Sequence, residues 1–159
     1  MTTGSKIKYF LISLAFLLLP ASCENNKNDV IPNVYTDFTM DISNDILFRD
    51  LTSIGNSVIV NYLTNNWGYR SAGYDSSGII VYRADLDQFY AYDRTCPYDY
   101  EVNNKTVKVN VDFTQAICPV CSTYYSLAAG GQPVSGPSRY PLKNYKTSFY
   151  GDNVRVWNY

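Results

Sequence analysis

Two cysteine–proline turns constrain the fold of this chain more than any other feature of its sequence. The first is Cys96-Pro97-Tyr98, the second is Cys118-Pro119-Val120-Cys121, and Ser135-Gly136-Pro137 follows them. Proline fixes φ and rigidifies tight loops, and a Gly-Pro pair is a further turn signal. The first cysteines of the two turns are 22 residues apart (118 − 96). We therefore expect two rigid loops that carry pairs of ligands to one end of a β-domain.

Short apolar stretches between turn signals predict an all-β chain. Residues 34–42 and 107–113 alternate apolar and polar side chains, which is typical of antiparallel strands with one buried face. Residues 45–51 suit a single helical turn, and residues 65–78 form a long surface loop rich in turn formers. Further strands are predicted at residues 58–63, 79–83, 89–93, 124–127, 145–150 and 154–157.

The composition excludes several classes of protein. The chain has 13 basic and 14 acidic residues and no basic stripe, so nucleic acid is not an expected partner. It has no histidine, which excludes a Ser-His-Asp triad, a Cys-His pair and histidine-bound zinc. No catalytic residue is therefore assigned from the sequence.

The N-terminal residues have the pattern of an export signal. Two lysines precede an apolar run over residues 9–19, and small residues follow it. The run of 11 residues (19 − 9 + 1) is too short for a transmembrane helix, which needs about 20. Ala21 and Ser22 before Cys23 resemble a bacterial lipobox, in which the cysteine is lipidated. Plain secretion with a free Cys23 is the alternative.

This pattern divides the chain into three segments. We expect a lipoprotein signal peptide over residues 1–22, a flexible tether over residues 23–32 and a β-domain over residues 33–159. The expected location is the bacterial cell envelope, in the periplasm or at the outer membrane, with the lipid on Cys23 as the membrane anchor. The sequence does not identify a redox or envelope protein partner.

Residues 79–145 resemble the cluster-binding part of a Rieske [2Fe–2S] domain. The resemblance rests on the strand at 79–82, the two cysteine–proline turns and the later Gly-Pro loop. It implies an antiparallel β-sandwich or barrel with a small cluster-binding subdomain. In that family two cysteines bind one iron and two histidines bind the other. Tyr98 and Cys121 stand at the two histidine positions here, so the resemblance implies a domain that has lost its usual ligands.

The family geometry would bring the thiols of Cys96, Cys118 and Cys121 together with the phenol of Tyr98, and three outcomes are open. In the first, no metal binds and Cys96 forms a disulfide with Cys118 or Cys121, which an oxidising compartment favours. Closing a loop of about 23 to 26 residues would contribute about 3 kcal/mol. In the second, a non-standard [2Fe–2S] cluster takes Tyr98 or Asp99 as fourth ligand. In the third, zinc binds the three thiolates.

Three classes of function are open. The favoured interpretation is a non-enzymatic structural or binding module without a cofactor. The alternative is a one-electron carrier with a [2Fe–2S] or zinc site on the three cysteines. A thiol oxidoreductase that uses Cys118 and Cys121 is a third hypothesis. In such an enzyme the Cys118-Pro119-Val120-Cys121 motif would open a helix within a βαβ unit, whereas strands are predicted on both sides of it here.

Overall fold

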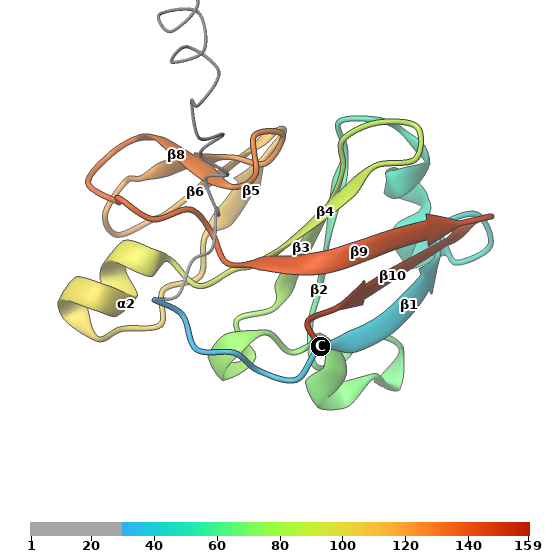
Figure 1. Ribbon diagram of the computed structural model, residues 1–159, viewed down its shortest axis with the longest axis horizontal. Helices are drawn as coiled ribbons and strands as arrows, with labels where there is room; N and C mark the ends of the chain where they lie inside the picture. The colour runs from blue at the N-terminus through green and yellow to red at the C-terminus, as the bar shows by residue number, and fades with distance from the viewer. Residues whose placement is uncertain (1–29) are drawn as a thin grey trace, which may run out of the picture.

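The computed structural model describes residues 30–159, and within them ten strands form two antiparallel sheets (Figure 1). The predicted signal peptide and Cys23 lie outside the described residues. The strands are β1 (Asp37–Asp41), β2 (Ser57–Val60), β3 (Ile79–Arg83), β4 (Phe89–Asp93), β5 (Asn110–Asp112), β6 (Gln115–Ile117), β7 (Tyr124–Ser126), β8 (Gln132–Ser135), β9 (Asn144–Tyr150) and β10 (Asn153–Trp157). The all-β class predicted from the sequence is confirmed.

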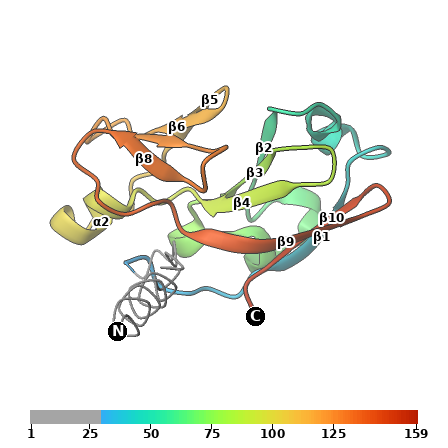
Figure 2. The ribbon, with the colours of Figure 1, turned by 45° about the horizontal axis from the view of Figure 1, so that its top comes forward.

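The larger sheet has the strand order β1-β10-β9-β4-β3-β2, and the smaller sheet has the order β5-β6-β7-β8. The smaller sheet and the helix α2 (Pro97–Asn103) lie at one end of the domain, beside β4, in both views (Figures 1 and 2). The remaining helices are short 3₁₀ segments: η2 (Ile46–Thr52), η3 (Thr64–Asn66), η4 (Gly68–Ser71) and η5 (Tyr74–Ser76). The last three occupy the predicted surface loop.

Strand β3 is apolar on both faces because it separates two hydrophobic cores. Ile79 and Val81 point into the core of the larger sheet, together with Phe89 and Ala91 of β4. Ile80 and Tyr82 alternate with them and point into a second core. Alternate side chains of a strand lie on opposite faces, so a strand buried on both sides has a continuous apolar run. The second core contains Ile80, Tyr82, Tyr92, Cys96, Val109, Ala116, Cys118, Tyr125, Leu127 and Leu142.

Several elements differ from the sequence-based predictions. The predicted strand at 107–113 is reduced to β5 and an isolated bridge between Thr95 and Lys108. Strand β5 ends at Asp112, because the chain turns towards β6 at Phe113, which has φ +51° and is 87% exposed. The sequence pattern does not predict strand β8. Ile31, assigned to the flexible tether, is fully buried, and its carbonyl accepts a hydrogen bond from Lys143 Nζ at 2.7 Å.

Candidate metal centre

The first cysteine turn runs from the end of β4 into helix α2. Cys96 is the N-cap residue of the helix, and Pro97 occupies the first turn, where its missing N–H costs nothing. The Cys96 amide donates to the Val107 carbonyl at 2.8 Å, which attaches the turn to the chain leading into β5. The helix ends at Asn104, in the left-handed region at φ +48°. Asp99 therefore lies in the first turn of α2, on the same short element as Cys96.

A buried carboxylate holds the base of this turn in place. Asp93, at the end of β4, is fully buried and accepts hydrogen bonds from the Thr95 amide at 2.8 Å and the Tyr145 hydroxyl at 2.7 Å. The Ser77 hydroxyl and the Tyr74 amide donate to it as well, at 2.8 and 2.6 Å. Although Asp93 lies at the end of a strand, its carboxylate is buried and hydrogen-bonded entirely by neutral donors.

The second cysteine turn connects β6 to β7. The Cys118 amide donates to the Thr123 carbonyl at 2.9 Å, and the Ser122 amide donates back to the Cys118 carbonyl at 3.1 Å. Ser122 has φ +57°, which closes the loop tightly. Strands flank this turn on both sides, as predicted. Cys118 and Cys121 therefore lie at one end of the smaller sheet, facing α2.

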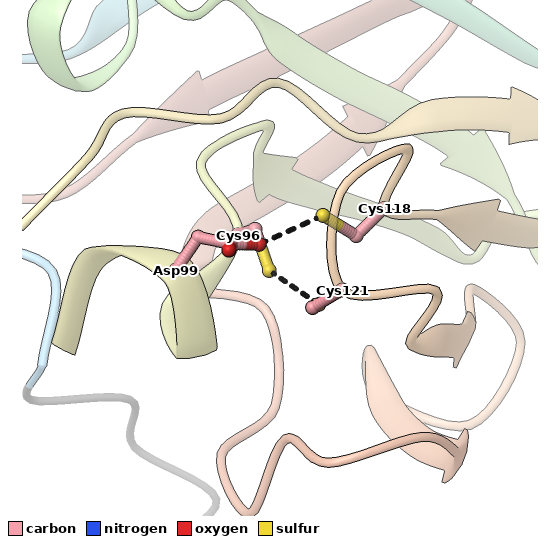
Figure 3. A group of neighbouring side chains, drawn as sticks. All are labelled: Cys96, Asp99, Cys118 and Cys121. Carbon is pink, nitrogen blue, oxygen red and sulfur yellow. Dashed lines mark hydrogen bonds between the residues drawn. The ribbon is translucent and has the colours of Figure 1, made fainter. Parts of the chain in front are cut away.

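The two turns bring three thiols and one carboxylate together (Figure 3). One ligand atom from each of Cys96, Asp99, Cys118 and Cys121 lies within 4.8 Å of the other three. The Cys96 and Cys121 sulfurs are 3.5 Å apart, and the Cys118 thiol donates to Asp99 Oδ2 at 3.0 Å. Cys96, Cys118 and Asp99 are buried and Cys121 is half-buried. The convergence of the three cysteines implied by the family resemblance is therefore present.

Asp99, rather than Tyr98, provides the oxygen atom in this group. Tyr98 is half-buried and lines a surface pocket. The other residues of that pocket are Glu101, Val102, Pro137, Arg139 and Tyr140. Of the two oxygen ligands proposed from the sequence, the structure places Asp99 among the sulfurs.

The three cysteines are free thiols in the structure, which differs from the predicted disulfide. Cys96 and Cys121 approach to 3.5 Å between sulfurs, whereas a disulfide bond is about 2.05 Å long. Each of the three thiols also has an oxygen partner. Cys118 contacts Asp99, as described, and the Cys121 thiol donates to Thr123 Oγ1 at 3.2 Å.

Hydroxyl groups and a glycine loop surround the thiols. The Tyr125 hydroxyl lies 3.4 Å from the Cys96 sulfur. The Ser138 amide donates to the Thr123 hydroxyl at 3.3 Å, which links the Gly-Pro loop to the second cysteine turn. Gly136 packs so closely that a Cβ there would lie 2.5 Å from Thr123 Cα. Residue spacing alone does not show that the hydroxyls of Thr123 and Tyr125 face the cysteines.

The electrostatics of the group favour protonated thiols at Cys118 and Cys121 beside an ionised Asp99 carboxylate. The contact with the Cys96 thiol, burial and the hydrogen bond to Asp99 raise the pKa of the Cys118 thiol. Burial raises the pKa of the Cys121 thiol. Burial alone would raise the pKa of Asp99, but hydrogen bonds from the thiols and the Asn103 amide outweigh it and lower that pKa.

The two sheets, with both cysteine turns at the end of the smaller one, form the Rieske-like all-β domain predicted from the sequence. No protein-family model and no curated protein sequence matches this chain.

Among solved structures, the chain is similar to the cyanobacterial plasma membrane Rieske protein PetC3 from Synechocystis PCC 6803. The identity is 20%, the match covers 78% of this chain and 98% of that chain, and the TM-score is 0.47. A ferredoxin from Sphingomonas yanoikuyae B1 is similar at 17% identity. The match covers 69% of this chain and 94% of the ferredoxin, and the TM-score is 0.43. At these identities and TM-scores, what this chain binds must be inferred from its own residues.

The residues of this chain do not fit the ligand set of a Rieske cluster. That cluster needs imidazole nitrogens on one of its two irons, and the chain has no histidine. The donors that converge are three sulfurs and one carboxylate oxygen, in one group rather than two separate pairs.

Proposed function

We propose that this chain is a lipid-anchored protein of the bacterial envelope whose Rieske-like domain binds metal through the thiolates of Cys96, Cys118 and Cys121. It acts as a binding module and not as an enzyme. The observation that supports this proposal most directly is the convergence of three thiols and a carboxylate within 4.8 Å.

The burial of these groups supports metal binding. Asp99 is 1% exposed and, among residues 30–159, forms no ion pair. A buried carboxylate without a compensating charge is costly, and buried charges are normally paired or coordinated to a metal. A cation between the sulfurs and Asp99 would supply that charge and would stabilise the deprotonated thiols.

The state of the thiols also supports a non-catalytic role. Reactive cysteines have a lowered pKa and lie at helix N-termini or beside cationic groups. Cys118 and Cys121 lie in a loop between two strands, and their pKa values are raised. A thiol oxidoreductase would need a cysteine with a lowered pKa. These cysteines therefore suit metal coordination better than thiol exchange.

Membrane attachment rests on the N-terminal sequence pattern. None of the helices within residues 30–159 has the length and apolar character needed to span a bilayer. We expect wild-type protein expressed with its N-terminus in a bacterial host to carry lipid on Cys23 and to sediment with membranes. Cys23→Ser should release the protein from the membrane fraction. Intact mass showing no lipid on the wild-type chain would rule out this anchor.

Metal content tests the proposed function. Full-length protein purified without oxygen in mild detergent should contain bound metal, measured by elemental mass spectrometry against protein concentration. Cys118→Ser should lose most of it. Tyr98→Phe is the matched control, because it alters a neighbouring side chain of the same helix outside the group, and it should retain wild-type content. Wild-type protein that holds no metal, even after reduction and incubation with zinc or iron, would refute the proposal.

A further inference from the structure

The spacing of the four donor atoms matches a single ion. Zinc binds thiolate sulfur at about 2.3 Å and carboxylate oxygen at about 2.0–2.2 Å. A tetrahedron with those bond lengths has sulfur–sulfur edges of about 3.8 Å and sulfur–oxygen edges of about 3.6 Å. The Cys96 and Cys121 sulfurs are 3.5 Å apart, and Cys118 Sγ is 3.0 Å from Asp99 Oδ2. Shifts of well under 1 Å along these two edges would reach that geometry.

A two-iron cluster requires a different arrangement. Its ligands form two pairs on opposite sides of the cluster, with both irons and the bridging sulfides between them. In this chain every donor atom of the group lies within 4.8 Å of every other. The four donors are therefore close enough together to surround one ion and do not separate into two pairs.

Asp99 is positioned to present one oxygen to that ion. The Asn103 amide, one helical turn further along α2, donates to Oδ1 at 3.0 Å. Oδ2 points to the sulfurs and is the atom that contacts Cys118. The Asn103 hydrogen bond thus orients the carboxylate as outer-shell partners commonly orient metal ligands.

Neutral donors are available to the sulfurs once they are deprotonated. The Thr123 hydroxyl accepts from the Ser138 amide, so its own proton is free to point to the Cys121 sulfur when that sulfur becomes a thiolate. The Tyr125 hydroxyl, 3.4 Å from the Cys96 sulfur, can likewise donate a hydrogen bond to that sulfur when it becomes a thiolate. Hydrogen bonds of this kind to charged acceptors are strong. They would moderate the net negative charge of three thiolates and a carboxylate around one divalent ion.

We infer that the centre is mononuclear: one tetrahedral divalent ion of the zinc class bound by Cys96, Cys118, Cys121 and Oδ2 of Asp99, and not a [2Fe–2S] cluster. This inference rests on the proposed metal-binding function and specifies its ion and its fourth ligand. A closed site with four protein ligands is the arrangement of structural zinc. The ion would hold the two cysteine turns together at the end of the smaller sheet.

Stoichiometry and one substitution test the inference on the full-length chain. Zinc, iron and acid-labile sulfide are measured per chain in protein purified without oxygen. Zinc affinity is then measured by competition with a chromophoric chelator for wild type, Asp99→Asn and Asp112→Asn. The last is the control, because Asp112 is an exposed carboxylate on β5. We expect one metal ion per chain, no labile sulfide, and a loss of affinity of at least about tenfold for Asp99→Asn alone.

The outcomes separate the two proposals. Two irons and two sulfides per chain would overturn the mononuclear centre while leaving metal binding intact. Equal affinity of Asp99→Asn and Asp112→Asn would overturn the role of Asp99. A wild-type chain without metal would overturn the proposed function as well. If Asp99→Asn does not fold, the absorption of Co²⁺-loaded wild type decides the matter: the tetrahedral spectrum of one ion bound by thiolates supports the inference, and an octahedral spectrum refutes it.

Discussion

Substitution of Gly136 tests how the Gly-Pro loop supports the proposed metal centre. It has φ +95°, and a Cβ at this position would lie 2.5 Å from Thr123 Cα, 2.8 Å from Thr123 Oγ1 and 3.1 Å from the Ser122 carbonyl oxygen. Two of these three atoms belong to the backbone, which cannot move aside without displacing the second cysteine turn. Gly136→Ala should therefore both destabilise the domain and disturb the metal ligands.

Gly55 provides a matched control. Its φ is +87°, close to that of Gly136, but nothing lies within 4 Å of a Cβ built there. Alanine at either position would incur a similar backbone strain of about 1–2 kcal/mol. Only Gly136→Ala adds overpacking, which typically costs about 1–3 kcal/mol. The difference between the two variants in the free energy of unfolding should therefore be about 1–3 kcal/mol.

Urea unfolding of reduced, metal-free protein measures this difference without a contribution from bound metal. Because the Cys118 amide bonds to the Thr123 carbonyl and the Cys121 thiol to its hydroxyl, Gly136→Ala should also weaken zinc binding, whereas Gly55→Ala should not. Equal destabilisation by the two substitutions, with equal zinc affinity, would show that the loop does not press on the cysteine turn as described.

Tyr145→Phe removes a hydrogen bond to the buried Asp93 carboxylate and should cost about 1.5–3 kcal/mol of unfolding free energy, whereas Tyr150→Phe, at a side chain that is 90% exposed, should cost almost nothing. Mild oxidation of metal-free protein by a small-molecule disulfide should link Cys96 to Cys121, whose sulfurs are 3.5 Å apart. Peptide mapping should find the same link in the Cys118→Ser variant. Mapping that finds another pairing would contradict this geometry. Zinc at about 100 times its dissociation constant should raise the unfolding free energy by about 2.7 kcal/mol, and an unchanged melting temperature would contradict specific binding to the native state.

Local sequence patterns predicted most of the strands. The continuous apolar run of β3 and the return strand β4 have the predicted bounds, Ile79–Arg83 and Phe89–Asp93, because a strand buried on both faces leaves an unambiguous apolar run between turn signals. Strand β8 could not be predicted from local pattern, because it contains Pro133 and two exposed residues, which are typical of a loop. Its pairing with β7 is a tertiary contact that local propensity does not show.

The cysteines of the proposed metal centre could be predicted from the sequence, whereas its proposed fourth ligand, Asp99, was one of two candidates. The Cys-Pro turns indicated where the sulfurs would meet. The choice of Asp99 over Tyr98 depends on the seven-residue helix α2, which turns the carboxylate towards Cys118. Part of a signal for that helix was present, since a proline followed two positions later by an acidic residue is typical of the first turn of a helix. The hydroxyls of Thr123 and Tyr125 became recognisable as partners only from the fold.

X-ray absorption at the metal edge of the native protein tests the mononuclear centre most directly, because it counts the atoms around the ion. The predicted result is a shell of three sulfurs at about 2.3 Å and one oxygen at about 2.0–2.2 Å, with no second metal nearby. An iron–iron scattering path, or a shell without three sulfurs, would contradict the assignment of Cys96, Cys118, Cys121 and Asp99 to a single ion.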